Sequence, residues 1–444
     1  MGSLRAPLSV QLELTYSCNH YCIYCFNHIR DVVEKKIKQV KVCLWEEIKK
    51  ILSTLADHGV FNIVLTGGEP LLRQDVAIKA VEYCTSRNIR VTLNTNAILL
   101  TPDILESLKN GGVYSLLISC PSMHADLYND IVQQNNFDKF LHAMELVKYS
   151  GLKYSINMVV NHANYHDVEY TARKLHGEFN CQMFSATPMA LNACYPQSQD
   201  GFLTSQEVTK LVERLVSLRD NFGIETDVFE SLVSCVIPDD IRKRDLGLTR
   251  RYCTAGRSVM VVGPNGDVRP CGHAPMNYGN ILNDKFDDIW QSMSPWRENE
   301  YVPDGCKECG FLARCKGGCR ISALAKFGSL YANDPWMREP ILERPLKKKI
   351  HTLSDLDDGY MISEPFRYRK EREGEYLVCT KGTNNLIRVN EPFFKFIIGL
   401  RASNVFSANQ LVNTYGFDIE HVVRLLSILK SNRIILPEPQ TAKC

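Results

Sequence analysis

The sequence of 444 residues contains no hydrophobic run that approaches the roughly 18 residues a membrane-spanning helix requires. Its first residues, MGSLRAPLSVQLEL, lack the continuous apolar segment of a secretory signal. Charge of one sign is not in excess either, because 52 Lys and Arg residues stand against 50 Asp and Glu residues. We therefore expect a cytoplasmic protein that has neither a membrane nor a nucleic acid as its partner.

Internal repeats and low-complexity tracts are also absent. Hydrophobic residues make up 45% of the chain and charged residues 23%, which excludes a mainly disordered or fibrous protein. What the sequence does contain in quantity is cysteine, with 17 residues. An odd number of cysteines in a chain without an export signal favours metal-binding or catalytic thiols over a disulfide framework.

The first half of the chain alternates β-rich runs with helical patterns. The strand-like runs begin at Val10, Asn62, Ile89, Tyr114, Lys153 and Cys181. They read as apolar on both sides, as expected for strands that are buried on both faces. Six strand-then-helix units in succession predict an α/β fold, a partial (β/α)6 barrel of TIM type over residues 1–235. The active face of such a barrel lies at the carboxyl ends of its strands.

Two further domains are expected after the barrel. Residues 236–349 are rich in cysteine and glycine and have few periodic runs, so something other than a large apolar core must hold them together. Residues 350–444 begin with a β-hairpin, EYLVCTKG and NLIRVN, and continue with helical patterns near 392–400 and 419–430. This pattern is typical of a small α+β module of winged-helix size.

A first group of cysteines follows the first predicted strand. Cys18, Cys22 and Cys25 have the spacing C-x3-C-x2-C. Thiolates are the ligands of iron–sulfur clusters, and three of them can hold one cubane whose fourth iron stays open to another ligand. By spacing alone, a zinc site completed by His20 or His28 and a set of three reactive thiols remain as alternatives.

This group and a second motif resemble the signature of the radical S-adenosylmethionine (SAM) superfamily. Tyr24 precedes the last cysteine, and the second predicted strand ends in Thr66 followed by Gly67, Gly68, Glu69 and Pro70. The resemblance implies that a 4Fe–4S cluster chelates SAM through its open iron and that the GGEP segment meets the SAM amino group. Paired glycines let backbone approach a ligand closely, and a carboxylate stabilises an ammonium group.

The same resemblance assigns SAM contacts to residues on later strands, with plain barrel filling as the alternative for the apolar ones: Asn94, Asn96, Ser119, Asn157, Met158 and Met183. Cys120 follows Ser119, where many relatives have Ser-Leu-Asp. The interpretations of Cys120 are an inert buried thiol or a catalytic thiol that donates a hydrogen atom near the substrate.

A second cysteine pattern lies in residues 253–319. Cys253 is followed by twelve residues, a glycine, four residues and Cys271, and then C-x2-C-x5-C-x3-C runs through Cys306, Cys309, Cys315 and Cys319. A zinc ribbon is the alternative by spacing. The whole pattern closely resembles the SPASM extension of radical SAM enzymes, which holds up to two auxiliary iron–sulfur clusters.

The resemblance implies crossed ligand sets, with Cys253, Cys271 and Cys319 at the nearer cluster and Cys306, Cys309 and Cys315 at the farther one. Relatives usually supply one more cysteine soon after an Asp-Pro pair, where this chain has Met337. For the farther cluster, an open site, Asp334 or a distant residue such as Cys379 are the alternatives. His273 is an alternative ligand of the nearer cluster, although we favour a solvated or structural role for it.

Residues 375–437 resemble the peptide-binding chaperone of pyrroloquinoline-quinone biosynthesis, the RiPP recognition element. An exposed strand edge of such a module can bind a leader peptide as an additional strand. A DNA-binding winged helix is the alternative, but the helical pattern near 419–430 carries only Arg424 and Lys430 as positive charges.

Together the resemblances imply a radical SAM/SPASM enzyme that modifies a ribosomally made peptide by means of a 5′-deoxyadenosyl radical, forming a thioether, ether or C–C bond. They also imply a reduced flavodoxin or ferredoxin as the electron donor. The alternatives are oxidation of a protein side chain as in sulfatase maturation, peptide epimerisation, and a non-catalytic metal-binding scaffold.

Overall fold

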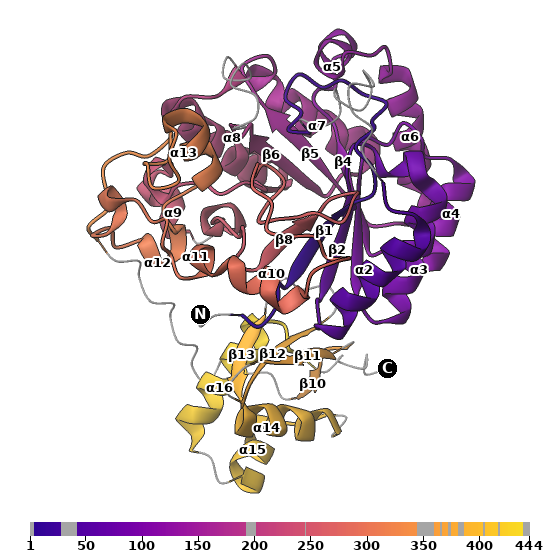
Figure 1. Cartoon of the computed structure of the whole chain (residues 1–444). Helices are drawn as coiled ribbons and strands as arrows, with labels where there is room; N and C mark the ends of the chain where they lie inside the picture. The colour runs from indigo at the N-terminus through magenta and orange to yellow at the C-terminus, as the bar shows by residue number, and fades with distance from the viewer. Residues whose placement is uncertain are drawn as a thin grey trace, which may run out of the picture. The chain divides into compact units, whose positions relative to one another are not determined.

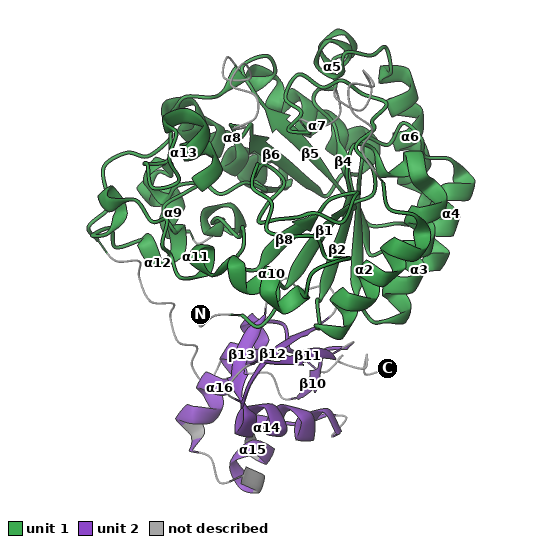
Figure 2. Ribbon diagram, viewed as in Figure 1, with its two compact units in different colours: residues 1–345 green, residues 346–444 purple. Residues whose placement is uncertain are grey.

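The structure is a computed structural model. It describes residues 4–27, 42–191, 201–244, 246–343, 359–364, 366–371, 374–380, 386–402, 405–415 and 418–437. The chain divides into two compact units, residues 1–345 and residues 346–444 (Figure 2). No helix within the described ranges combines the length and the apolar character needed to cross a membrane.

The first unit is built on one large sheet, in the order β7-β6-β5-β4-β3-β2-β1-β8-β9 (Figure 1). Its strands are β1 (Ser9–Glu13), β2 (Asn62–Thr66), β3 (Arg90–Thr95), β4 (Ser115–Ser119), β5 (Tyr154–Val160), β6 (Met183–Pro188), β7 (Glu225–Asp227), β8 (Val259–Val262) and β9 (Val268–Arg269). Neighbours from β7 to β8 are parallel, and only β9 runs antiparallel, against β8. The six predicted parallel strands are confirmed, and β7, β8 and β9 extend the sheet.

Helices connect the parallel strands, as the alternating pattern predicts. They are α2 (Trp45–Asp57), α3 (Gln74–Ser86), α4 (Pro102–Gly111), α5 (Ala125–Val132), α6 (Phe137–Ser150), α7 (Val168–Phe179) and α8 (Ser205–Phe222). Helix α2 buries the apolar stripe Ile48, Ile51, Leu52 and Leu55. Figure 1 shows α2, α3, α4 and α6 as a layer along one side of the strands. This layer covers the apolar face of the sheet.

The two faces of the strands differ in polarity. Residues such as Leu12, Leu65 and Ile118 are fully buried, whereas the alternate positions, among them Asn94 and Ser119, are polar and only partly buried. Alternate side chains of a strand point to opposite faces of the sheet. The expectation of strands that are apolar on both sides is therefore wrong, because the second face lines a polar interior.

The cysteine-rich region belongs to the first unit. Its β8 pairs with β1, so it shares the sheet of the barrel. Trp290, Trp296 and Trp336 are almost completely buried, and Trp290 Nε1 donates to Leu4 O at 2.8 Å. The region thus packs more apolar surface than its irregular sequence indicates. Its helical segments are η4 (Ser234–Val236), α9 (Asp239–Lys243), η5 (Gly247–Arg250), α10 (Phe286–Ser292), α11 (Ser294–Arg297), η6 (Asp304–Cys306), α12 (Leu312–Cys315) and α13 (Arg320–Phe327).

The second unit has its own buried core, which includes Val378, Ile397 and Leu426. It contains β10 (Tyr360–Ile362), β11 (Phe366–Lys370), β12 (Glu375–Thr380), β13 (Ile387–Asn390), α14 (Glu391–Ala402), α15 (Ala408–Tyr415), α16 (Ile419–Ser431) and β14 (Ile435–Pro437). The predicted hairpin is confirmed as the antiparallel pair β12 and β13, and β11 completes a three-stranded sheet. Strands β10 and β11 and helix α15 were not predicted.

Candidate active site and cluster-binding cysteines

The first three cysteines lie in the loop that follows β1. Backbone hydrogen bonds from Tyr21 N to Val132 O (2.9 Å) and from Ile23 N to Ile131 O (3.0 Å) fasten this loop to the end of α5. Cys18, Cys22 and Cys25 are each partly buried, and none of the described cysteines forms a disulfide. The loop therefore presents three thiols from a fixed backbone at the carboxyl end of the sheet.

Aromatic side chains surround these thiols. Burial is the main reason that the pKa of Tyr24 is raised well above its usual value, and the nearby Cys22 thiol adds to the rise. His20 is buried and packs edge-on against Tyr128, with ring centroids 6.2 Å apart. Burial lowers the pKa of His20 to about 4. His20 is thus a neutral packing residue, while His28, the other histidine of the zinc alternative, lies outside the described residues.

The two glycines of the GGEP segment pack directly against the start of the cysteine loop. Gly68 N donates to Thr15 O at 2.8 Å, and Glu69 N donates to Ser17 O at 2.9 Å. A Cβ atom on Gly68 would lie 1.9 Å from Ser17 O, and Gly67 has φ +138°. Only glycine fits both conditions at these two positions.

Glu69 connects the end of β2 with the end of β3. Its Oε1 accepts from Leu71 N (3.0 Å) and Thr95 Oγ1 (2.8 Å), and its Oε2 accepts from Asn96 N (2.8 Å). The side chain is almost fully buried, and burial raises its pKa to about 7. The carboxylate thus has three protein donors, and its observed contacts position the strand ends.

Asn96 extends this connection to the cysteine loop. Its Nδ2 donates to Asn19 Oδ1 at 2.6 Å and approaches Cys18 Sγ at 4.0 Å. His20 N also donates to Cys18 Sγ, at 3.4 Å. A chain of contacts therefore leads from the buried Glu69 through Asn96 to the first thiol.

The polar face of the sheet carries most of the remaining predicted residues. Asn94, Ser119 and Asn157 all lie on this face, and Ser119 and Asn157 are register partners. Asn94 Oδ1 is buried and accepts no hydrogen bond from the described part of the chain. A buried acceptor without a donor fits a ligand that carries hydroxyl or ammonium groups, as SAM does.

Asn157 is held by two hydroxyl groups that the sequence analysis missed. Its Oδ1 accepts from Ser185 Oγ at 2.9 Å and from Thr187 Oγ1 at 2.7 Å, both on β6. These residues alternate along the strand, so they share the face of Asn157. The alternation of apolar and polar residues in residues 184–187, FSAT, could have indicated these two hydroxyl groups.

Two of the residues predicted to contact SAM do not lie beside Asn157 on the polar face of the sheet. Met158 is fully buried and, by alternation, lies on the opposite face from Asn157. Met183 is the first residue of β6, at the amino end of the strand. At about 3.3 Å per residue it lies roughly 13 Å along the strand from Thr187. Neither position supports the predicted contact with SAM.

Cys120 lies just beyond β4. Its thiol is fully buried and donates to Ser122 O at 3.3 Å. Burial raises the pKa of this thiol far above its usual value. The arrangement favours the inert interpretation, and a hydrogen-donating role for Cys120 stays a prediction.

A buried ion pair joins the barrel to the cysteine-rich region. Glu13, at the end of β1, accepts from Arg269 Nη2 at 2.5 Å across 256 residues of sequence, and Arg269 Nη1 also donates to Gly272 O. Burial raises the pKa of Glu13, and the adjacent Arg269 opposes that rise. The pair was not predicted, because its partners belong to different expected domains.

The thiols of Cys253, Cys271 and Cys319 affect one another's pKa. Burial raises the pKa of Cys271 well above its usual value, and the nearby thiols of Cys319 and Cys253 raise it further. Glu230 also raises the pKa of all three thiols. The crossed ligand set expected for the nearer cluster stays a prediction.

His273, two residues after Cys271, contacts the first cysteine loop. Phe26, which follows Cys25, packs against His273 with ring centroids 4.7 Å apart. His273 Nδ1 lies 3.6 Å from Glu230 Oε1. These contacts assign His273 a packing role between two cysteine regions, as the structural interpretation expects.

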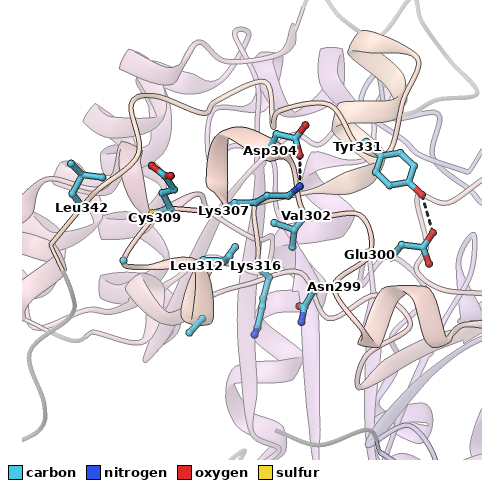
Figure 3. A pocket seen from close by; sticks show the side chains of 13 residues that line it. Asn299, Glu300, Val302, Asp304, Lys307, Cys309, Leu312, Lys316, Tyr331 and Leu342 are labelled. Carbon is cyan, nitrogen blue, oxygen red and sulfur yellow. Dashed lines mark hydrogen bonds and ion pairs between the residues drawn. The ribbon is translucent and has the colours of Figure 1, made fainter.

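Cys306, Cys309 and Cys315 form a separate group. Burial raises the pKa of Cys306 to about 12, and Cys315 and Cys309 contribute to the rise. An open hollow of about 900 Å³ lies beside Cys309 (Figure 3). Lys307 pairs with Asp304 at 2.6 Å on its wall, and Tyr331 donates to Glu300 at 2.9 Å. Cys309 is thus reached from the solvent side.

The chemistry of the donor sets fits iron–sulfur clusters, because thiolates are the ligands that such clusters use. Within the described ranges, no three His, Cys, Asp or Glu side chains are grouped as the ligands of a single metal ion. Cys18, Cys22 and Cys25 come from one short loop, whereas Cys253, Cys271 and Cys319 come from distant parts of the sequence.

Comparisons with known proteins agree with this geometry. Residues 12–175 match the radical SAM superfamily, and residues 253–310 match the SPASM iron–sulfur cluster-binding domain. The chain is 26% identical over 359 residues to an AdoMet-dependent heme synthase of Methanosarcina barkeri, covering 78% of this chain and 99% of that protein. It is 25% identical to a PqqA peptide cyclase of Methylobacterium nodulans, covering 83% and 94%. The structure of Streptococcus suis SuiB bound to its precursor peptide SuiA superposes with a TM-score of 0.59 at 18% identity, covering 75% and 76%.

Proposed function

Because this chain belongs to the radical SAM superfamily and carries a SPASM domain, we propose that it is an enzyme that modifies a ribosomally made peptide. In this superfamily a 4Fe–4S cluster reduces bound SAM and thereby supplies a 5′-deoxyadenosyl radical that removes a hydrogen atom from the substrate. The auxiliary clusters of the SPASM domain are its further cofactors. The superfamily match favours an enzyme over the metal-binding scaffold.

The residues of this chain have distinct parts in that chemistry. Cys18, Cys22 and Cys25 would hold the cluster, and the contacts of Asn96 and Glu69 fix the loop that carries the first thiol. Asn94 Oδ1 would accept a donor of bound SAM. The covering helices shield the apolar face of the sheet, and the bound groups would be oriented on its opposite, polar face.

A peptide substrate is supported by the second unit. Strands β11 and β13 are the two outer strands of its three-stranded sheet. An outer strand can accept a peptide as an additional strand, with backbone hydrogen bonds that are independent of the peptide sequence. The name of the PqqA peptide cyclase, whose length this chain largely spans, supports the same substrate class.

Helix α16 does not favour a nucleic-acid partner for this unit. Its N-cap residue Asp418 accepts from His421 N at 2.9 Å, and Glu420 lies in the first turn. These acidic groups offset Arg424 and Lys430 in a helix that would have to face phosphates. We therefore assign the unit to leader-peptide recognition.

The match to the heme synthase favours a second candidate, a haem precursor as the substrate. That candidate keeps the same cluster and SAM chemistry. It gives no role to a peptide-binding sheet edge, which is why the peptide is preferred.

Release of 5′-deoxyadenosine tests the proposal. The full-length protein is reconstituted anaerobically with SAM and a strong reductant, alone and with any short peptide that is encoded beside its gene. A Cys18/Cys22/Cys25→Ala variant is the control. We expect release that requires the three cysteines and a mass change in the peptide.

Removing residues 346–444 separates recognition from chemistry. We expect the truncated enzyme to cleave SAM but to lose efficient modification of the peptide. Efficient modification by the truncated enzyme would refute the recognition role, and modification of a haem precursor alone would refute the peptide substrate.

A further inference from the structure

The farther cysteine group has a neighbour that the cysteine pattern does not include. Cys235 lies in η4, upstream of Cys253, and is partly buried. Because Cys235 stands outside both spaced motifs, the sequence alone does not indicate its role. The contacts of Cys235 in the structure do indicate a role.

Two contacts place Cys235 beside this group. Ser234 N donates to Cys315 Sγ at 3.4 Å, so the backbone next to Cys235 touches one thiol of the group. On the other side, Arg338 N donates to Cys235 Sγ at 3.3 Å, while Met337 Sδ lies 3.7 Å from Cys306 Sγ. Because residues 337 and 338 are adjacent, Cys235 and Cys306 contact the same short turn.

The contacts through Ser234 and through residues 337–338 add Cys235 to the group of Cys306, Cys309 and Cys315. A fully ligated 4Fe–4S cluster uses four thiolates.

The other proposed fourth ligands are engaged elsewhere. Asp334 Oδ2 accepts from Cys319 N at 2.7 Å, and its Oδ1 accepts from Trp336 N at 2.8 Å. This buried carboxylate therefore caps two backbone segments. Cys379 is buried in β12, within the core of the second unit.

We propose that Cys235 is the fourth protein ligand of the auxiliary cluster held by Cys306, Cys309 and Cys315. It would take the place of the additional cysteine that the resemblance to SPASM proteins implies near Met337. With four protein ligands, this cluster would have no open iron for an exogenous ligand. It would serve in electron transfer or stabilise the fold, and it would not bind the substrate. The inference depends on the SPASM domain and is independent of the identity of the peptide.

Alkylation of the unaltered protein gives the first test. The full-length protein, purified anaerobically with its clusters, is treated with iodoacetamide before and after iron is removed with a chelator and an oxidant. Mass spectrometry then measures labelling at each cysteine. We expect Cys235 to be protected together with Cys306, Cys309 and Cys315 in the loaded protein and labelled after iron removal. Equal labelling of Cys235 in both states would overturn the proposal.

The spectrum of the reduced cluster gives the second test. In the Cys18/Cys22/Cys25→Ala background only auxiliary clusters remain, so their electron paramagnetic resonance is seen alone. We expect Cys235→Ser to shift this spectrum, because an alkoxide replaces a thiolate, and the matched control Cys379→Ala to leave it unchanged. An unchanged Cys235→Ser spectrum, or a shift in Cys379→Ala, would reject Cys235 as the ligand. Absence of all iron from this background would instead contradict the SPASM assignment itself.

Discussion

Replacing Gly68 by alanine tests how tightly the GGEP segment packs against the first cysteine loop. The added Cβ would lie 1.9 Å from Ser17 O and 2.5 Å from Ser17 C, whereas ordinary contacts begin at 3.4 Å. The obstacle is backbone, so no side-chain rotation relieves it. The two segments must separate by about 1.5 Å before an alanine fits.

That displacement has a calculable cost. It disrupts the hydrogen bonds from Gly68 N to Thr15 O and from Glu69 N to Ser17 O, each of which contributes about 1 kcal/mol. Strain from overpacking adds about 1–3 kcal/mol, so we expect a loss of about 3–5 kcal/mol in the free energy of unfolding. Because Ser17 precedes Cys18, we also expect the first cluster site to bind less iron.

Gly177 offers a matched control. It lies in α7, and a Cβ on it would meet nothing within 4 Å. An alanine in a helix interior is favoured over glycine by about 0.5–1 kcal/mol, so Gly177→Ala is expected to stabilise the protein. Denaturant unfolding and iron content after anaerobic reconstitution measure both variants. A Gly68→Ala protein with wild-type stability and iron content would refute the steric argument.

Three further predictions concern the buried polar groups. Arg269→Met leaves Glu13 buried without its partner and is expected to destabilise the fold by about 3–5 kcal/mol, measured by denaturant unfolding; a loss below 1 kcal/mol would contradict it. Asn157→Ala removes the acceptor of Ser185 and Thr187 and is expected to weaken SAM binding in equilibrium dialysis while the clusters stay loaded. The pKa of Glu69, about 7 in the folded protein, lies above its unfolded value, so its contribution to stability is present at low pH and is lost as the pH rises through 7. Wild type should therefore gain stability relative to Glu69→Gln between pH 7.5 and pH 5, and parallel pH curves would disprove this.

Local spacing made the first cysteine loop and the strand order predictable. Cys18, Cys22 and Cys25 lie within one short segment, so their proximity follows from chain connectivity. The six predicted strands are confirmed because β-rich runs alternate with helical stripes over the whole barrel. The hairpin of the second unit could be predicted for the same reason, since β12 and β13 are neighbours in sequence.

Contacts between distant segments could not be predicted in this way. The pairing of Glu13 with Arg269 and the approach of Cys235 to Cys315 depend on how β8 and η4 pack, which no local pattern encodes. The contact of Met183 with SAM was expected from the resemblance alone, and β6 begins at Met183 rather than at Cys181. The alternation of polar and apolar residues in β1 and β3 was available in the sequence, but the apolar residues of the other runs led to the expectation of strands that are apolar on both sides.

The pairing of β1 with β8 has a consequence for synthesis of the chain. Ser9 is the register partner of Val259, so one side of β1 finds its neighbour only after some 250 further residues have been made. At about 5–20 residues per second, a ribosome takes roughly 12–50 s over that stretch. During this interval the nascent barrel exposes an unpaired strand edge next to its first cysteine loop, which invites mispairing with other chains. The protein is therefore expected to depend on chaperones, or on slow expression at low temperature, for a good yield of its folded form.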